Sequence, residues 1–274
     1  MKQKLSQLPA PAIAGVVREK TVLGAIAEIK NCMYDGATMI DLHLSCLENS
    51  DVEQLSTIVN STNLPILALN YNTTYDWRGA DLSEDTRVES LLRAVKAGAA
   101  GIDMQGYTFH APSKTEFCGE DKYSFTKGNP KEVVTDEAII ARQCALIDEV
   151  HSMGAEVLLS CHPGIAMTAE QVVDLALFLE KRNPDIIKIV TRAENEDDLA
   201  ESIRAMLLLK KAVKTPVAYH ANSKAGMASR IINPLLGSQI AFCVDHYNEG
   251  STMEQIDLRS TKTIVDHVKR ITGE

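Results

Sequence analysis

Ile186-Ile187-Lys188-Ile189-Val190 is an apolar run of strand length with a lysine at its centre. Short runs rich in Ile, Val and Leu, without polar alternation, are typical of parallel strands that are buried on both faces. Similar runs recur along the chain, so the sequence predicts eight strands. They are Ile13–Val17, Met39–Leu42, Ile66–Leu69, Gly101–Met104, Val157–Ser160, Ile186–Val190, Val217–His220 and Ile240–Val244.

Helix-length segments separate many of these runs. Ser83, Thr135 and Thr168 are each followed closely by acidic residues, which is a common signature of a helix start. Gly98 and Gly154 stand where two helices are expected to end. The predicted helices are Thr86–Ala97, Ala138–Met153, Gln171–Lys181, Asn195–Lys211 and Met253–Ile271.

The repeated strand–helix pattern favours an α/β fold, a closed (β/α)8 barrel (TIM barrel) that forms a single domain over residues 1–274. An open doubly wound sheet is the alternative, but Gly15-Val16-Val17-Arg18 offers no glycine-rich turn for a dinucleotide after the first strand. The long connection at 105–135 interrupts the pattern and is rich in aromatic and charged residues. On the C-terminal face of a barrel, such a loop is expected to be a lid or a dimer contact.

The charge and cysteine content limit the partners and the compartment. A formal net charge of −9 argues against nucleic acid or an anionic membrane as the main partner. The chain has no apolar run approaching the ~18 residues of a membrane span. Its six cysteines are scattered, without a CxxC pair, so we expect a reducing, cytoplasmic location.

Lys188 and His162 are the candidate catalytic residues. A lysine inside a buried strand must be paired or neutral, and burial lowers the pKa of a lysine so that its amine can form a Schiff base. The alternative is a side chain that reaches past the strand end to a carboxylate or to solvent. His162, in Ser160-Cys161-His162-Pro163, ends the neighbouring strand, about 4.8 Å away. Next to a nucleophilic lysine, this histidine is better explained as an acid–base residue than as a group that merely binds backbone.

Two later segments contain candidate binding residues. In Ser223–Arg230, small residues allow close approach of backbone, and Arg230 can bind a carboxylate through two parallel hydrogen bonds. Gly250–Gln255 predicts a loop that closes over the site and presents Ser251 and Gln255. The alternatives are a surface arginine after a turn and a plain connection with a capping hydroxyl.

Taken together, these motifs resemble type I 3-dehydroquinate dehydratase over nearly the whole chain. The most specific match is Gly226-Met227-Ala228-Ser229-Arg230-Ile231 followed by Pro234-Leu235-Leu236-Gly237-Ser238, which places Arg230 as the carboxylate-binding arginine. The other matching segments are Gly101-Ile102-Asp103-Met104-Gln105, Ser160-Cys161-His162, Ile187-Lys188-Ile189 and Gln255-Ile256.

The resemblance implies a (β/α)8 hydro-lyase of the shikimate pathway, usually a homodimer, that needs no metal or organic cofactor. In such an enzyme Lys188 forms an imine with a small keto acid, and His162 moves the proton. Arg230 and Gln255 hold the carboxylate of the substrate, and Ser251 is a further substrate-binding residue of the closing loop. The reaction converts 3-dehydroquinate into 3-dehydroshikimate and water. The histidines also lack the HxH or HExxH spacing of a metal site.

Several positions depart from the family pattern. Asp41-Leu42-His43 stands where the family has Glu-x-Arg, Asn70 stands where it has an arginine, and Pro163 replaces an Asp or Asn. The acidic residue that orients the histidine has no evident counterpart in residues 72–76. We predict that Asp41, His43 and Asn70 contact the substrate, Asp41 and His43 through water, and that Arg78 or the long loop replaces lost contacts.

Three hypotheses remain open from the sequence. The first is the dehydratase, and the second is a Schiff-base lyase or aldolase of the same class that acts on a different keto acid. The third is a non-catalytic barrel that binds a metabolite. Trapping of an imine at Lys188 separates the first two hypotheses from the third.

Overall fold

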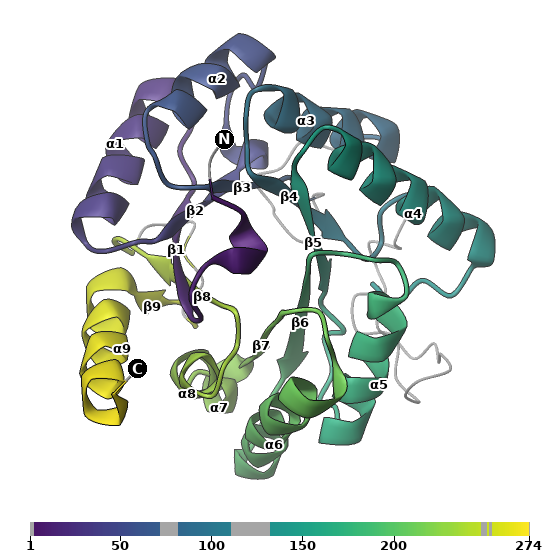
Figure 1. Cartoon of the computed structure of the whole chain (residues 1–274), viewed down its shortest axis with the longest axis vertical. Helices are drawn as coiled ribbons and strands as arrows, with labels where there is room; N and C mark the ends of the chain where they lie inside the picture. Colours follow the sequence, from purple (N-terminus) through teal and green to yellow (C-terminus); the bar gives the residue numbers. More distant parts are fainter. Residues whose placement is uncertain (1–2, 72–81, 111–131, 248–250, 252–253, 274) are drawn as a thin grey trace.

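The computed structural model describes residues 3–71, 82–110, 132–247, 251 and 254–273. Strands form the ring at the centre of Figure 1, and helices surround it. The strands are β1 (Ala12–Val17), β2 (Met39–His43), β3 (Ile66–Leu69), β4 (Gly101–Gln105), β5 (Glu156–Cys161), β6 (Ile186–Arg192), β7 (Val217–Asn222), β8 (Ile240–Val244) and β9 (Ile256–Asp257). The helices are α1 (Val22–Tyr34), α2 (Val52–Asn60), α3 (Glu84–Lys96), α4 (Glu137–Ser152), α5 (Ala169–Glu180), α6 (Glu196–Ala212), α7 (Ser223–Gly226), α8 (Ser229–Leu235) and α9 (Leu258–Thr272), with short 3-10 turns η1 (Leu5–Gln7) and η2 (Leu44–Cys46).

All the strand pairs of the sheet are parallel, in the order β7-β6-β5-β4-β3-β2-β1-β8-β9. The sheet curls into a barrel, so that β7 and β8 approach each other. At this seam the backbone N–H of Gln239 donates to the carbonyl of Val217 at 2.8 Å. The C-terminal ends of the strands therefore meet at one mouth of the barrel, where the side chains that follow each strand are brought together.

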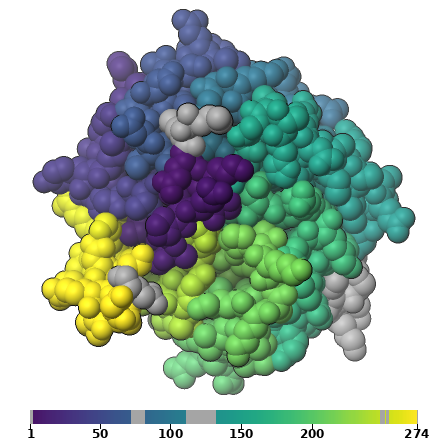
Figure 2. Space-filling view, in the orientation of Figure 1, coloured from purple at the N-terminus to yellow at the C-terminus, as the bar shows by residue number. Residues whose placement is uncertain are grey.

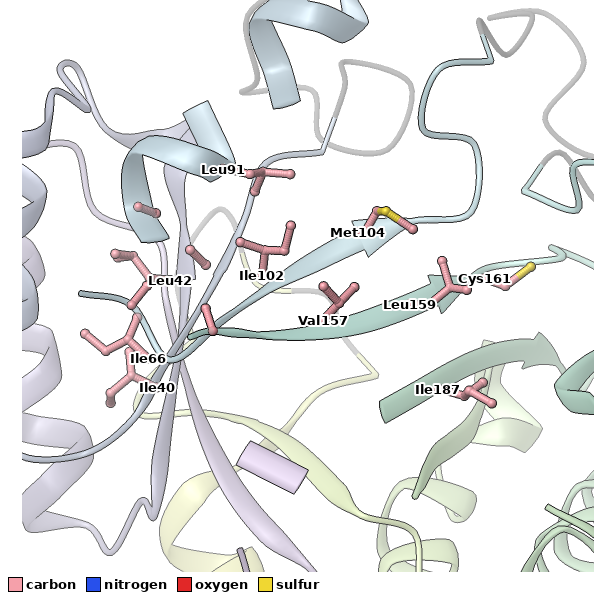
Figure 3. Close-up of a cluster of buried hydrophobic side chains, with 14 of the residues drawn as sticks. Ile40, Leu42, Ile66, Leu91, Ile102, Met104, Val157, Leu159, Cys161 and Ile187 are labelled. Carbon is pink, nitrogen blue, oxygen red and sulfur yellow. The ribbon is translucent and has the colours of Figure 1, made fainter. Parts of the chain in front are cut away.

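Alternating side chains divide each strand between two environments. Ile187 and Ile189 belong to the large apolar cluster between the strands and the helices, and Lys188 between them faces the lumen. Ile102 in the same outer cluster precedes Asp103, which also faces the lumen. Figure 3 shows part of this outer cluster, including Ile40, Leu42, Ile66, Val157, Leu159 and Cys161.

The lumen contains a smaller apolar cluster near the N-terminal ends of the strands. Leu5 and Leu8 of the N-terminal segment pack there against inward residues such as Leu67 and Ile186. In Figure 2 this segment, coloured purple, covers the middle of the visible face. The N-terminal end of the barrel is thus filled, which leaves the opposite mouth for a ligand.

The strand predictions are confirmed to within two residues at each end. Three helix starts are also confirmed, because Ser83, Asp136 and Thr168 accept hydrogen bonds from the first turns of α3, α4 and α5. Gly98 and Gly154 follow α3 and α4 with φ of 99° and 83°, which suits glycine.

The prediction for the last helix is wrong at its start. Instead of a helix from Met253, Ile256 and Asp257 form β9 beside Cys243 and Val244, and α9 begins only at Leu258. Asp257 caps α9 by accepting from the backbone of Ser260, so the helix cannot extend further back.

Two other expectations concern segments that the structure describes incompletely. Most of the long connection lies outside the described residues, so its role as a lid or dimer contact stays a prediction. Arg78 also lies outside them. Among the described residues, no helix has both the length and the apolar character needed to cross a membrane.

Candidate active site

Lys188 lies in the middle of β6, and its ammonium group points into the lumen. Its Nζ donates to the hydroxyl of Tyr71 at 3.1 Å and to Oδ2 of Asp103 at 3.3 Å. The ring centroid of Phe242 on β8 lies 4.4 Å from Nζ. The lysine is only 6% exposed. A buried amine is therefore available inside the barrel, which the sequence predicted from the apolar run around it.

Asp103 on β4 is the carboxylate that compensates the charge of Lys188. It is fully buried, and Gln105 donates from Nε2 to its other oxygen, Oδ1, at 3.2 Å. The oxygen of the Gln105 amide accepts from the guanidinium of Arg87. These bonds fix the position of Asp103. An ammonium is not a nucleophile, so Lys188 must be without its extra proton when it attacks a carbonyl, and Asp103 is a carboxylate within reach of that proton.

His162, immediately after β5, is oriented by a carboxylate that the sequence analysis missed. Oε2 of Glu132 accepts from the backbone N–H of His162 at 2.5 Å and lies 2.8 Å from its Nδ1. Glu132 is fully buried. The carboxylate places the proton on Nδ1 and leaves Nε2 to exchange protons with a ligand. Glu132 comes 30 residues before His162 and near the end of the long connection, so no local spacing signalled the pairing.

Tyr71 joins the two candidate catalytic residues. Its hydroxyl lies 3.1 Å from Nζ of Lys188, 3.4 Å from Nε2 of His162 and 3.3 Å from Oδ2 of Asp103. Burial raises the pKa of the Tyr71 phenol well above its ordinary value, and the carboxylates of Asp103, Glu132 and Asp41 raise it further. The phenol is therefore neutral at physiological pH and can relay a proton between the amine and the imidazole.

Arg230 lies across the mouth on α8 and is 9% exposed. Its Nη2 donates to Oδ1 of Asn222 at 2.6 Å, and its buried Nε has no hydrogen-bond partner among the described residues. Burial lowers the pKa of Arg230 to about 10, against the opposing effect of Glu254. The guanidinium remains charged at neutral pH and has donor capacity left for a carboxylate.

Gln255 and Ser251 follow β8, as the sequence predicted. Gln255 is 6% exposed, and its Oε1 accepts from Nη1 of Arg18 at 2.9 Å. Ser251 is half-buried, while its neighbours in the loop lie outside the described residues. Arg18, which follows β1, thus fixes the position of the Gln255 side chain. Contact of either residue with a substrate stays a prediction.

Asp41 and His43 share the inward face of β2, whereas Asn70 points away from the lumen. Oδ2 of Asp41 lies 3.6 Å from Nε2 of His43, and both residues are buried. Oδ1 of Asp41 is buried and has no hydrogen-bond partner in the described part of the chain. Asn70 donates instead from Nδ2 to Oγ of Ser90 on α3 at 2.7 Å. Asp41 and His43 are therefore placed to meet a ligand, and the amide of Asn70 is engaged with the helix layer.

His220 on β7 is a further lumen residue that the sequence analysis did not single out. It is 6% exposed, and its ring centroid lies 6.4 Å from that of Phe242. Burial lowers the pKa of His220 well below its ordinary value, and the nearby charges of Arg230, Lys188 and His162 lower it further. The imidazole is therefore neutral at physiological pH.

Side chains that could share a metal ion lie elsewhere in the described part of the chain. Within the described residues, the group of side chains close enough to share an ion is Glu28, Asp245 and His246, beside α1 and the end of β8. None of these three belongs to the cluster around Lys188.

Comparison with known proteins points to one family. The family model for type I 3-dehydroquinase matches residues 132–271, about half of the chain. A 3-dehydroquinate dehydratase from Klebsiella pneumoniae is 26% identical over 208 residues, which cover 70% of this chain and 80% of that protein. One from Aromatoleum aromaticum is 22% identical over 231 residues, which cover 82% and 77%.

A solved structure supports the same fold. The 3-dehydroquinate dehydratase of Geobacillus kaustophilus superimposes with a TM-score of 0.76 at 14% identity, covering 98% of this chain and 97% of that one. At this identity the likeness establishes the barrel architecture, and the roles of individual residues rest on the geometry above.

Proposed function

The chain belongs to the type I 3-dehydroquinase family, and on that premise we propose that it is a Schiff-base-forming dehydratase that converts 3-dehydroquinate into 3-dehydroshikimate and water. The observation that carries the proposal is the pairing of a buried amine with an oriented imidazole. Lys188 and His162 contact the same phenol, that of Tyr71, from adjacent strands. This is the arrangement that imine formation followed by proton transfer requires.

The first stage is the formation of the imine. Lys188 loses a proton and its neutral amine adds to the ketone carbon, which gives a carbinolamine. Loss of water from this adduct gives a protonated imine. The phenol of Tyr71 and the carboxylate of Asp103 lie within 3.3 Å of Nζ and are the groups available to accept and return the proton.

The second stage removes the elements of water from the bound substrate. The cationic imine draws electrons and makes the neighbouring C–H acidic, and Nε2 of His162 takes this proton. The resulting enamine expels the hydroxyl on the next carbon, which leaves with the proton from His162. Hydrolysis of the imine releases the unsaturated product and regenerates Lys188. General acid–base catalysis of this kind typically contributes about 10²–10⁴-fold.

Arg230, with Gln255 and Ser251, is proposed to bind the carboxylate of the substrate. The Nε of Arg230, which has no hydrogen-bond partner within the described residues, supports this role. Asp41 and His43 are proposed to contact the hydroxyl-bearing side of the ring. We also propose a homodimer in the cytoplasm, which size-exclusion chromatography and cell fractionation test.

Borohydride trapping tests the imine directly. Incubation with 3-dehydroquinate and borohydride is expected to add the ligand mass to the Lys188 peptide, and absorbance is expected to report formation of dehydroshikimate. Lys188→Ala is expected to lose both signals, and Lys188→Arg, which keeps a cation beside Asp103, serves as the variant that preserves the buried pair. Lys211→Ala, at an exposed position of α6, is the control. An unlabelled Lys188 in active wild-type enzyme contradicts the proposal.

The second candidate function is the same imine chemistry on a different keto acid. It is favoured by the buried Asp41–His43 pair and by the outward position of Asn70, which change the polar surface offered to the ring. This function predicts labelling of Lys188 by other carbonyl acids and no absorbance signal from dehydroshikimate.

A further inference from the structure

His220 occupies the stretch of lumen between the amine and the arginine. Along β7 the inward residues are Ala218, His220 and Asn222, and Ala218 is level with Lys188 in the sheet register. Asn222 is the residue that accepts from Arg230. Successive inward residues of a strand are about 6.6 Å apart, so His220 lies one such step from each level. A ligand that reaches from the amine to the guanidinium therefore passes this imidazole.

The ring nitrogens of His220 are not used by the part of the chain that the structure describes. Among the described residues, His220 forms no hydrogen bond, although it is 6% exposed. Its neighbours in the lumen are the ring of Phe242 and the side chains of Arg230, Lys188 and His162. The ring nitrogens are therefore available to a ligand group that enters the lumen.

A hydroxyl is the ligand group that matches this residue. Burial, and to a smaller extent the nearby charges, lowers the pKa of His220, so the ring is neutral and one ring nitrogen donates while the other accepts. A carboxylate only accepts, and Arg230 already provides charged donors for it. A hydroxyl both donates and accepts, and it is the complement of a neutral imidazole.

We propose that His220 is a specificity-determining residue that hydrogen-bonds a hydroxyl carried by the substrate between its imine carbon and its carboxylate. This inference rests on the proposed function for the placement of the ligand. In 3-dehydroquinate this hydroxyl is the one that leaves, so the ring N–H of His220 donates to the departing oxygen while His162 supplies the proton.

Carbonyl-free ligands test the contact without any chemistry at Lys188. The matched pair is quinate and its 1-deoxy analogue, which lacks the hydroxyl on the carbon that bears the carboxylate. Dissociation constants are measured by calorimetry for wild type, His220→Leu and His220→Asn. His267→Leu, at an exposed position of α9, is the control.

We expect wild type to prefer quinate by about 3- to 10-fold, which is the range for one neutral hydrogen bond. His220→Leu is expected to bring this ratio within about twofold of unity, because leucine has no polar atom. His220→Asn is expected to keep part of the preference, and His267→Leu all of it. The melting temperature of His220→Leu is expected not to fall, since the replacement breaks no side-chain hydrogen bond to the described residues.

Three results overturn the inference: no preference in wild type, an unchanged preference in His220→Leu, or no binding of either ligand. The proposed function fails separately. If 3-dehydroquinate does not label Lys188 while the hydroxyl preference depends on His220, the imine chemistry is wrong and the contact stands. If 3-dehydroquinate labels Lys188 but the preference for quinate is the same in His220→Leu as in wild type, only the proposed contact of His220 is wrong.

Discussion

Glu132→Gln is the substitution that probes the catalytic geometry most directly. It removes one negative charge beside His162 and keeps an amide oxygen in the same place. Oε2 of Glu132 lies 2.8 Å from Nδ1 of His162, and the residue is fully buried, so water cannot readily replace the charge. We expect kcat for dehydration to fall by about 10²–10³-fold.

The magnitude follows from the positive charge that His162 acquires when it takes the substrate proton. The contact of 2.8 Å places the centres of the two charges about 4 Å apart. At that separation and an effective dielectric constant of about 20, the attraction is about 4 kcal/mol. Its complete loss corresponds to about 10³-fold in rate, and the dipole of the new amide retains part of it.

The assay combines dehydroshikimate absorbance with borohydride trapping at Lys188. Trapping with 3-dehydroquinate is expected to persist in Glu132→Gln, because the carboxylate acts on His162 rather than on the amine. Glu137→Gln, an exposed acid at the start of α4, is the matched control and is expected to keep wild-type kcat. A loss in kcat smaller than about tenfold, or a loss of trapping equal to the loss of turnover, refutes the reasoning.

Three further predictions follow from the same geometry. Tyr71→Phe removes the hydroxyl that contacts both Lys188 and His162, and kcat is expected to fall by about 10- to 10²-fold, since hydrogen bonds to charged groups contribute about 1.5–3 kcal/mol; an unchanged kcat argues against the relay. Gly106→Ala introduces a methyl group that clashes with the carbonyl oxygen of Glu132, so we expect about 1–3 kcal/mol of destabilisation in urea unfolding and a lower kcat, and a fully active, equally stable variant contradicts this. The lowered pKa of His220 means that the unfolded chain binds a proton below pH 6.5 that the folded chain does not, so the free energy of unfolding is expected to fall as pH drops below that value, by up to about 1.4 kcal/mol per pH unit. His220→Leu is expected to remove this pH dependence. If urea unfolding of wild type and His220→Leu gives the same slope of free energy against pH, the contribution of His220 is excluded.

The barrel is predictable from the sequence because its strands are buried on both faces. Runs such as Ile186–Val190 are apolar at nearly every position, which strongly restricts where they can lie. Serine, threonine and aspartate before the helices are used as caps, as expected. The error at the start of the last helix has a local cause. Two residues, Ile256 and Asp257, gain strand pairing with β8, which a helical pattern does not show.

The candidate site is only partly predictable, because its partners come from distant parts of the chain. Lys188 and His162 can be identified from their positions in or beside predicted strands. Their partners cannot, because Tyr71 is 117 residues from Lys188 and Glu132 is 30 residues from His162. Strand alternation does contain more information than the motifs alone. It places Cys161 in the outer core, as observed, and it also places Asn70 on the outward side, where its amide meets Ser90.

The charged side chains around the lumen indicate which ligand charge the site accepts. Lys188 is compensated by Asp103 at 3.3 Å, and His162 by Glu132 at 2.8 Å. Arg230 is different, because its side chain donates to the neutral amide of Asn222 and no carboxylate of the described residues lies within ion-pair distance of it. A buried guanidinium without a carboxylate partner is best compensated by an anionic ligand group. In either form of the imine chemistry, the charge of Arg230 therefore favours a keto acid whose carboxylate reaches this guanidinium.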